Sequence, residues 1–409
     1  MESPQRKGSF GNISRTLFDG EMWCICRCDL LVRFCCQGLQ RWERGLATES
    51  RETPSFGAFA FRSKIKNISN FEKYFMAKSY YLFNPGRMSR RDNTLKFEAV
   101  AENGQKQAAK YLPIEGVEDL YVFGSVDANS ALYAFLGKQG VSVHFFDYYE
   151  HYRGSFMPKE YLLAGKVQVE QTKLYLNKKK RLFLAQSIVE GAAFNMCKNL
   201  RYYDKRGKDL EEPILRIEGY VQSILKVNDV NELMGIEGNI RQAYYSGFNE
   251  ILSEFSFNGR NRQPPRDPIN ALISFGNMMC YTTCLGQIYH TQLNPTIGFL
   301  HEPGMRRYTL SLDLAEIFKP ILVDRLIFKM VNKKMLDVSD FDSSVNHCTL
   351  KDKGRKAFIK QYDEKLKDTI HHRTLDKKVS YKRLIRLECY KMIKHVLGMN
   401  EYRPFKIYW

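Results

Sequence analysis

The sequence predicts an α+β protein in which a small β-rich domain precedes a larger helical domain, and three observations indicate this class. Between about residues 78 and 152, short apolar runs separated by turn residues are typical of strands. From Ala164 onward, apolar residues recur at helical spacing. Near Met76 the composition changes, which separates an N-terminal extension from both domains. The expected parts are residues 1–75, 76–157 and 158–409.

The extension, residues 1–75, has no clear periodicity and crowds five cysteines together. It is interpreted as upstream sequence included by start-site choice, or as a poorly ordered appendage. A small Cys-rich metal module is the alternative, but the C-x-C-x-C pattern and the adjacent pair lack the C-x₂-C repeat of ordinary zinc folds. The remaining cysteines are dispersed, as expected for reduced, buried thiols of a cytoplasmic protein. The crowded residues are Cys24, Cys26, Cys28, Cys35 and Cys36.

The β-rich domain is expected to be a small sheet structure interrupted by one helix. Asp92 and Asn93 predict a turn between two of its strands. The helix should span Ser130–Lys138, bury its apolar positions and stop at Gly140, because glycine tolerates the left-handed conformation of a helix end. The expected strands are Tyr80–Phe83, Leu95–Ala99, Leu120–Phe123 and Val141–Phe146, and the inward helix residues are Leu132, Phe135 and Leu136.

The helical domain is expected to follow a hinge at Arg153–Pro158. Asp204–Glu212 is a charged connection between two helices, closed by Pro213, and a further helix should span Asn231–Phe255. The apolar faces of the first two helices are assigned from the 3.6-residue period. They contain Leu182, Ala185, Ile188, Val189 and Ala192 in the first helix, and Leu215, Val221 and Leu225 in the second.

Capping signals predict another helix after a proline-containing loop. Asp267 is a plausible N-cap and Pro268 suits the first helical position, since its missing N–H has no helical partner to lose. A second helix should begin near Ser311, and residues 351–394 form a Lys- and Arg-rich helical tail with an apolar inner stripe. The apolar face of the capped helix contains Leu272, Ile273, Met279 and Leu285.

The composition predicts a globular protein with an anionic partner. Of its 409 residues 44% are hydrophobic, enough for sizeable cores, and the formal net charge is +18. Such a charge favours nucleic acid or an acidic membrane surface as the partner. No apolar run approaches the roughly 20 residues that a membrane span needs, and no cleavable signal is evident, so the expected location is the cytoplasm.

Three residues have side chains whose types indicate metal chemistry: His301, Asp313 and Glu316. Imidazole nitrogen and carboxylate oxygen together suit Mn²⁺ or Mg²⁺, and the absence of a nearby thiolate argues against structural zinc. Asp313 and Glu316 are three residues apart, so they share a helix face. Alternatively, the acids only offset the helix dipole and His301 is a satisfied core or loop histidine.

Five arginines are candidate DNA-binding residues. Arg260, Arg262 and Arg266 surround a Pro-Pro pair, and arginine grips phosphate through bidentate contacts. Arg306 and Arg307, close to His301 in the sequence, are candidates for the same role. The alternative is that the loop arginines pair with acids such as Glu254 or Asp267 and only brace the loop.

Three ordered motifs carry a resemblance to a known family. LMGIEGNIRQAYY, NGRNRQPPRDPINALISFG and GFLHEPGMRRYTLSLDLAEIFKPILVDR closely resemble the signatures of the universal adaptation nuclease of CRISPR systems, an integrase family. The resemblance runs from about Met76 to the C-terminus. It implies that Glu237, His301 and Glu316 take the places of three metal ligands, the last being aspartate in some members. Asp313 matches a further acidic position at that site. Pairing of Glu237 with Arg241 on a helix surface is the alternative.

The resemblance also implies a fold and an activity. We expect a β-sandwich-like domain that builds a homodimer, then an all-α catalytic domain that uses Mn²⁺ or Mg²⁺. The expected activity is that of a DNA endonuclease and integrase, which inserts foreign DNA spacers into a CRISPR array by transesterification. Its expected partners are double-stranded DNA (spacer precursor and repeat) and a small ferredoxin-like adaptation protein. Alternatives are a stand-alone metal-dependent DNA nuclease in repair or transposition, and a non-catalytic DNA-binding scaffold that tolerates loss of Glu237.

Overall fold

The computed structural model describes residues 78–100, 105, 107–147, 151–158, 164–261, 264–305, 307–343 and 347–408. All of them belong to one compact unit, Ser69–Trp409. The predicted extension at residues 1–75, with its five cysteines, lies outside the described residues, and so do Arg262 and Arg306.

The first sheet is largely parallel, with strand order β1-β5-β7-β8. Neighbours β1, β5 and β7 pair in parallel, whereas β8 is antiparallel to β7. The hinge predicted at Arg153–Pro158 is therefore wrong for residues 153–156, because they belong to β8, in which Gly154 pairs with Phe145. The strands are β1 (Lys78–Leu82), β5 (Val117–Val122), β7 (Ser142–Phe146) and β8 (Tyr152–Phe156).

The second sheet has strand order β4-β3-β2-β6 and shares one apolar core with the first sheet and helix α3 (Ser130–Gln139). Asn129 caps α3, and Gly140 ends it with a φ of 74°, as predicted. Leu132, Phe135 and Leu136 are buried, which confirms the expected face. The strands are β2 (Gly86–Arg91), β3 (Thr94–Ala99), β4 (Lys110–Pro113) and β6 (Val126–Asp127).

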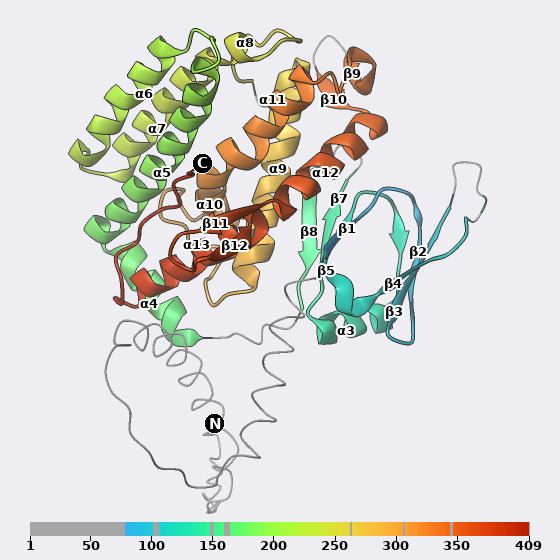
Figure 1. Cartoon of the computed structure of the whole chain (residues 1–409). Coiled ribbons are helices and arrows are strands. Elements are labelled where there is room, and N and C mark those ends of the chain that lie inside the picture. Colours follow the sequence, from blue (N-terminus) through green and yellow to red (C-terminus); the bar gives the residue numbers. More distant parts are fainter. Residues whose placement is uncertain are drawn as a thin grey trace, which may run out of the picture. The chain divides into compact units, whose positions relative to one another are not determined.

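From Gly165 onward the described chain is mainly helical, so the α+β class is confirmed (Figure 1). None of the described helices is long and apolar enough to cross a membrane. The helices are α4 (Gly165–Leu176), α5 (Lys178–Asp204), α6 (Glu211–Ser223), α7 (Val230–Ser246), α8 (Phe248–Ile251), α9 (Pro268–Tyr289), α10 (Thr309–Lys319), α11 (Arg325–Asn332), α12 (Asp352–Lys367) and α13 (Tyr381–Val396). Short 3₁₀ turns span Ile114–Gly116, Ile224–Lys226 and Val338–Asp340, and a π turn spans Pro320–Asp324.

The expectation of a purely helical second domain needs correction, because two small antiparallel pairs lie within it. One pair precedes α12, and the other separates α12 from α13 in the tail that was expected to be helical. The strands are β9 (Phe341–Ser343) with β10 (Cys348–Leu350), and β11 (Thr369–His372) with β12 (Lys377–Ser380).

Two other helix predictions are wrong in detail. Leu215 and Leu225, the latter in the 3₁₀ turn after α6, are 58% and 81% exposed, whereas Val221 packs against the core as predicted. Ile214 and Ile217 form the buried face at the start of α6, so the apolar period was assigned out of phase there. The helix expected over Asn231–Phe255 ends at Ser246, as α7. At Gly247 a Cβ atom would lie 2.8 Å from the Leu210 side chain, so the chain packs closely where the helix ends.

Helix α9 forms as predicted and places the candidate site. The Asp267 side chain accepts the Asn270 N–H at the N-cap, and Pro268 occupies the first turn. Leu272, Ile273, Met279 and Leu285 are all fully buried. Because this apolar helix is covered along its length, it provides a rigid support for the loop that follows it.

A buried ionic network joins the first sheet to α9 and α13. Lys382 of α13 lies 2.8 Å from Glu118 and 2.7 Å from Asp119 of β5, and Arg386 contacts Glu118 at 2.5 Å. Burial opposes ionisation of Glu118, but attraction by Lys382 and Arg386 outweighs it and lowers the pKa of this carboxyl. His144 of β7 and His290, which caps α9, face the same two acids and are buried.

The two histidines predict how stability depends on pH. Burial lowers the pKa of each imidazole to about 4, below the unfolded value of about 6.5. Between pH 6.5 and 4 the unfolded chain therefore binds protons that the folded chain does not. The free energy of unfolding should fall as pH falls, by roughly 1.4 kcal/mol per pH unit for each histidine.

Urea unfolding of wild type and a His144→Asn, His290→Gln variant between pH 7 and 4 checks this expectation. The asparagine retains a polar group for Ser155, which lies 2.6 Å from His144 Nδ1. The variant should lose stability less steeply than wild type as the solution is acidified. An unchanged pH slope would contradict the assignment of this dependence to the two imidazoles.

Candidate active site

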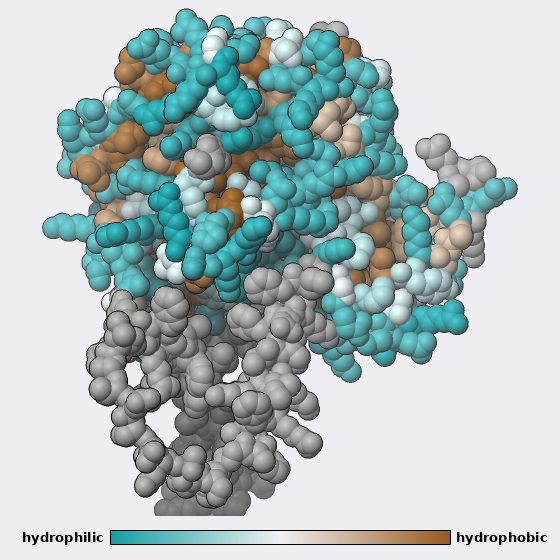
Figure 2. Space-filling view, in the orientation of Figure 1, coloured by the Kyte–Doolittle hydropathy of each residue, from teal (hydrophilic) through white to brown (hydrophobic). Residues whose placement is uncertain are grey.

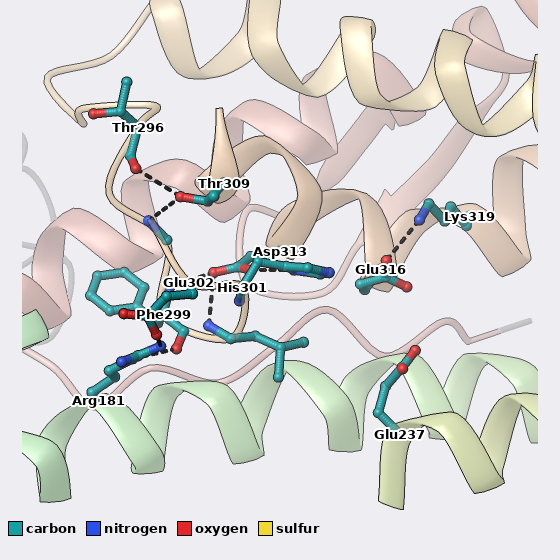
Figure 3. Close-up of polar contacts among 12 residues, drawn as sticks. Arg181, Glu237, Thr296, Phe299, His301, Glu302, Thr309, Asp313, Glu316 and Lys319 are labelled. Atoms are coloured by element: carbon teal, nitrogen blue, oxygen red, sulfur yellow. Dashed lines mark hydrogen bonds and ion pairs between the residues drawn. The ribbon is translucent and has the colours of Figure 1, made fainter. Parts of the chain in front are cut away.

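The predicted chemistry-bearing residues come from α7, α10 and the loop between α9 and α10. Glu237 lies on α7, whose N-terminus is capped by Asp229, and Asp313 and Glu316 lie on α10. His301 lies in the loop that leads into α10. Figure 3 shows Glu237 pointing from α7 toward Glu316, with the His301–Asp313 pair farther along α10.

Asp313 organises the loop that carries His301. Its side chain is fully buried and accepts the backbone N–H groups of Phe299, Leu300 and His301 at 2.5, 3.1 and 2.9 Å. It also lies 2.8 Å from His301 Nδ1. With Nδ1–H donating to the carboxylate, Nε2 carries the lone pair that a metal ligand needs. At Gly298 a Cβ would lie 2.9 Å from the same carboxylate, so the loop packs closely there.

The other side of this loop is held by α4 and α5. Arg181 donates to the carbonyl of Phe299 at 2.9 Å and to the carboxylate of Glu302 at 2.6 Å (Figure 3). Tyr175 also donates a hydrogen bond to Glu302. We did not predict these contacts, because more than one hundred residues separate the partners in sequence and no local pattern links them. The loop next to His301 is therefore fastened on two sides.

Glu237 and Glu316 meet at one guanidinium. Arg241, one turn after Glu237 on α7, contacts both carboxylates, and Lys319 lies 2.7 Å from Glu316. The predicted alternative, an i, i+4 pair of Glu237 and Arg241, is present, but it is not a surface contact because the Glu237 side chain is only 15% exposed. A neighbouring acid, Asp324, is fully buried beside Arg241.

Burial and the charges of this group shift the pKa values of its members. Burial opposes ionisation of Glu237, but the charge of Arg241 outweighs it and lowers the pKa of the carboxyl. Burial, followed by repulsion from Arg241, lowers the pKa of Lys319 to about 8. Burial also raises the pKa of Asp324 to about 6 despite attraction by Arg241. Such perturbed values are typical of functional sites.

The structure gathers the predicted residues into two groups. Glu237 and Glu316 share Arg241, while His301 pairs with Asp313. Within the described part of the chain, no three His, Cys, Asp or Glu side chains lie close enough together to hold an ion as they stand. The donor chemistry nevertheless fits a divalent cation, because two carboxylates already converge on one positive group and His301 presents a free imidazole nitrogen.

The arginines in the loop before α9 lie in different surroundings: Arg260 is bonded to α9, whereas Arg266 is exposed. Arg260 donates to Asn270 at 2.8 Å and to Ser274 at 3.0 Å, so it braces the loop against α9. The acids expected as its partners have other roles: Glu254 pairs with Lys334, and Asp267 caps α9. Arg266 and Arg307 are exposed. Arg262 and Arg306 lie outside the described residues.

Comparison with known proteins identifies the family. The family model described as CRISPR associated protein Cas1 matches residues 80–364. The chain belongs to the Cas1 family. It is 48% identical to a Thermodesulfovibrio yellowstonii protein named CRISPR-associated endonuclease Cas1 3, over 81% of this chain and all of that protein. A Pyrococcus horikoshii CRISPR-associated endonuclease Cas1 is 41% identical over 80% of this chain and 98% of its own length.

Solved structures show the same fold. A CAS1 protein from Thermotoga maritima superposes with a TM-score of 0.70 and is 38% identical, covering 80% of this chain and 99% of that one. A casposase bound to an integration product superposes with a TM-score of 0.73 at 20% identity, which shows only that its fold is shared. That match covers 80% of this chain and 93% of the casposase. The α+β architecture described above is thus that of the Cas1 family.

The arginine geometry gives a prediction for this Cas1 family member. Arg260→Ala removes two inward hydrogen bonds and should lower the free energy of unfolding by about 1–3 kcal/mol, with little effect on the salt dependence of DNA binding. Arg266→Ala should leave stability within about 0.5 kcal/mol of wild type. It should weaken duplex binding and flatten the plot of log affinity against log salt by about 0.9.

Urea unfolding and fluorescence anisotropy with a labelled duplex at several salt concentrations separate the two roles. The two variants are matched controls for one another, because each removes one arginine from the same loop. A stability loss in Arg266→Ala, or a flattened salt plot in Arg260→Ala, would contradict this assignment.

Proposed function

We propose that this protein is a divalent-metal-dependent DNA endonuclease and integrase that inserts captured DNA into a CRISPR array. The proposal rests on one observation: Arg241 contacts the carboxylates of both Glu237 and Glu316. Beside them lies the loop that carries His301, which Asp313 and Arg181 hold in place. Family relatives named as endonucleases support cleavage of phosphodiesters. Strand transfer is the same displacement with a DNA 3′-hydroxyl in place of water.

Glu237, Glu316 and His301 are the residues that we propose to hold the cation, Mn²⁺ or Mg²⁺. When bound, such a cation polarises a phosphoryl oxygen and stabilises the negative charge that develops during the displacement. Arg241 competes for the same two carboxylates, since it contacts both of them. Cation binding is therefore coupled to a rearrangement of this arginine.

The protein's own contribution is mainly to position these groups. Asp313 holds the His301 Nδ1 proton and thereby leaves Nε2 free, while its three backbone contacts keep the loop from shifting. Arg241 and Lys319 lie beside the acids as positive charges that suit an anionic phosphate. Orientation of the attacking hydroxyl along the line of the breaking bond then supplies much of the rate.

Substrate and partners follow from charge and family. The formal net charge of +18, together with exposed Arg266 and Arg307, supports binding of double-stranded DNA. The proposed assembly is a homodimer that works with a small ferredoxin-like adaptation protein. A solved Cas6-RT-Cas1–Cas2 complex contains a chain of the same fold at 16% identity, which makes such an assembly a reasonable arrangement to test.

A strand-transfer assay tests the proposal. Purified protein, with and without its small partner, is incubated with short fluorescent duplexes and a supercoiled plasmid carrying a CRISPR repeat. We expect label to become joined to the plasmid only with Mn²⁺ or Mg²⁺ and only when the duplex has a 3′-hydroxyl. Duplexes ending in a 3′-dideoxynucleotide should still be hydrolysed but not joined.

Two outcomes would overturn the proposal. Products that form equally in the presence of EDTA would contradict metal dependence. If every duplex is cleaved but none is joined to the plasmid, even with the partner present, the protein is a nuclease rather than an integrase.

A further inference from the structure

The loop that carries His301 connects α9 to α10, and its described residues form neither helix nor strand. No helix or sheet ladder therefore pairs its backbone N–H and C=O groups, so side chains must pair those that are shielded from water. Asp313 pairs three N–H groups next to His301. At the start of the same loop, this task falls to Gln171 of α4, a residue outside the ligand set.

Gln171 is fully buried, and its amide binds the loop backbone. Nε2 donates to the carbonyls of Asn294 and Ile297 at 3.0 and 2.9 Å, and Oε1 accepts the Asn294 N–H at 2.9 Å. A glutamine amide has two N–H donors and two acceptor lone pairs. Three of these four positions are therefore used on backbone groups of one loop.

Packing alone does not explain a glutamine at this position. The buried residues of α4 are Val167, Gln171 and Leu174, whose spacing places them on one helix face. Figure 2 shows a mainly hydrophilic surface over α4, in agreement with exposed Lys166 and Lys173. An amide on the inward face lowers stability unless it is hydrogen-bonded, whereas methionine would fill the same space without that requirement.

The contacts made by Gln171 lead toward the histidine. Thr309 Oγ1 donates to the carbonyl of Thr296 at 2.7 Å and accepts the Gly298 N–H at 2.9 Å (Figure 3). At Gly298 a Cβ would lie 2.9 Å from the Asp313 carboxylate, so the backbone packs closely against that group. Movement at the start of the loop is therefore passed to the carboxylate that orients His301.

We infer that Gln171 is a positioning residue for the reaction, which keeps His301 oriented by holding the start of its loop. The assignment rests on the proposed function, in which His301 is one of three groups that hold the cation. Gln171 acts through backbone atoms of Asn294 and Ile297, so its loss should change how His301 presents Nε2. A residue that only filled the core would not have this effect.

Gln171→Met in the full-length protein tests the inference, because it keeps the length of the side chain and removes all three hydrogen bonds. We expect kcat for DNA cleavage to fall about 10- to 100-fold, with KM for DNA within about twofold of wild type. Isothermal titration with Mn²⁺ in the absence of DNA should show about 10-fold weaker binding. The variant should melt about 2–6 °C below wild type.

Two further measurements need neither metal nor DNA. Amide hydrogen exchange, followed by mass spectrometry, should be about 10-fold faster in the peptide spanning residues 294–302 of the variant. Ring ¹⁵N spectra of histidine-labelled protein report which nitrogen carries the proton. His301 should carry it on Nδ1 in wild type, facing Asp313, and on either nitrogen in the variant. His301→Ala assigns the signal.

The matched control is Asn332→Leu, which removes another side-chain amide that holds a loop. Asn332 accepts the Ser253 N–H at 3.0 Å and donates to the carbonyl of Ile251 at 2.9 Å, after α8. This variant should also melt below wild type, but its kcat and Mn²⁺ binding should be unchanged. If Gln171→Met does not fold, Gln171→Glu takes its place; it keeps the acceptor for Asn294 N–H, loses both donors and should show the same losses.

The outcomes separate a positioning role from a structural one. A Gln171→Met protein that melts lower but keeps wild-type kcat and Mn²⁺ affinity would overturn the inference, and so would equal losses of both in Asn332→Leu. If wild type itself neither binds Mn²⁺ nor cleaves DNA, the proposed function is wrong. The exchange and ¹⁵N measurements then decide the role of Gln171 by themselves, and unchanged results in the variant would exclude it.

Discussion

Glu237→Ala, His301→Ala and Glu316→Ala are each expected to lower DNA cleavage and strand transfer by roughly 10²- to 10⁴-fold. Each change removes one ligand of the proposed cation, whose charge stabilisation of the transition state would be worth several kcal/mol. Duplex binding should remain within about twofold of wild type, since phosphate contacts elsewhere supply most of the affinity. Single-turnover assays with Mn²⁺ measure the loss. Isothermal titration with Mn²⁺ measures cation binding independently of activity.

The folded state should survive these changes. Arg241 contacts both Glu237 and Glu316, so each glutamate variant leaves it one carboxylate partner, and His301→Ala leaves it both. Glu237→Gln retains the shape of the side chain, and Glu232→Ala removes an exposed acid from the same helix as a control. Activity close to wild type in any of the three ligand variants would refute the proposed cation site. Loss of activity in Glu232→Ala would show that the assay reports helix damage.

Asp313→Asn should have the second large effect, on stability and activity together. The carboxylate accepts four hydrogen bonds while fully buried, and an amide presents an N–H group toward some of the same donors. We expect the free energy of unfolding to fall by about 3 kcal/mol. Cleavage, measured where the variant is still folded, should fall roughly 10- to 100-fold because His301 loses the group that orients it.

A second buried acid provides the comparison for this variant. Asp340 is buried, lies outside the candidate site and holds the capping contact of a short helix through the Asp337 N–H at 3.0 Å. Asp340→Asn should also destabilise the fold but leave cleavage unchanged below its melting temperature. If Asp313→Asn behaves like Asp340→Asn, with a stability loss alone, then Asp313 does not position His301.

The elements predicted most accurately have strong local signals. Helix α9 begins where Asp267 and Pro268 predict, and α3 ends at Gly140, because caps and left-handed glycines depend on neighbouring residues alone. Predictions failed where local patterns were ambiguous. Gly154 looked like a hinge but pairs within a sheet, and the apolar residues of α6 fit two phases of the helical period.

In the candidate site too, local signals predicted some features and only the tertiary structure showed the others. Sequence motifs alone pointed to Glu237, His301, Glu316 and Asp313, and the family match agrees with the resemblance that those motifs carry. The sequence also indicated a basic protein with a β-rich part before a helical one. Those conclusions depend on residue types, spacing and composition, which need no knowledge of packing.

Tertiary structure alone decided what surrounds those residues. It placed Arg241 between two acids from different helices, turned Arg260 inward, and brought Arg181 to a loop 118 residues away in sequence. It also brought Gln171 of α4 to the start of the same loop. These contacts join segments that are distant in the chain, and they form because burying apolar helix faces fixes which polar side chains meet.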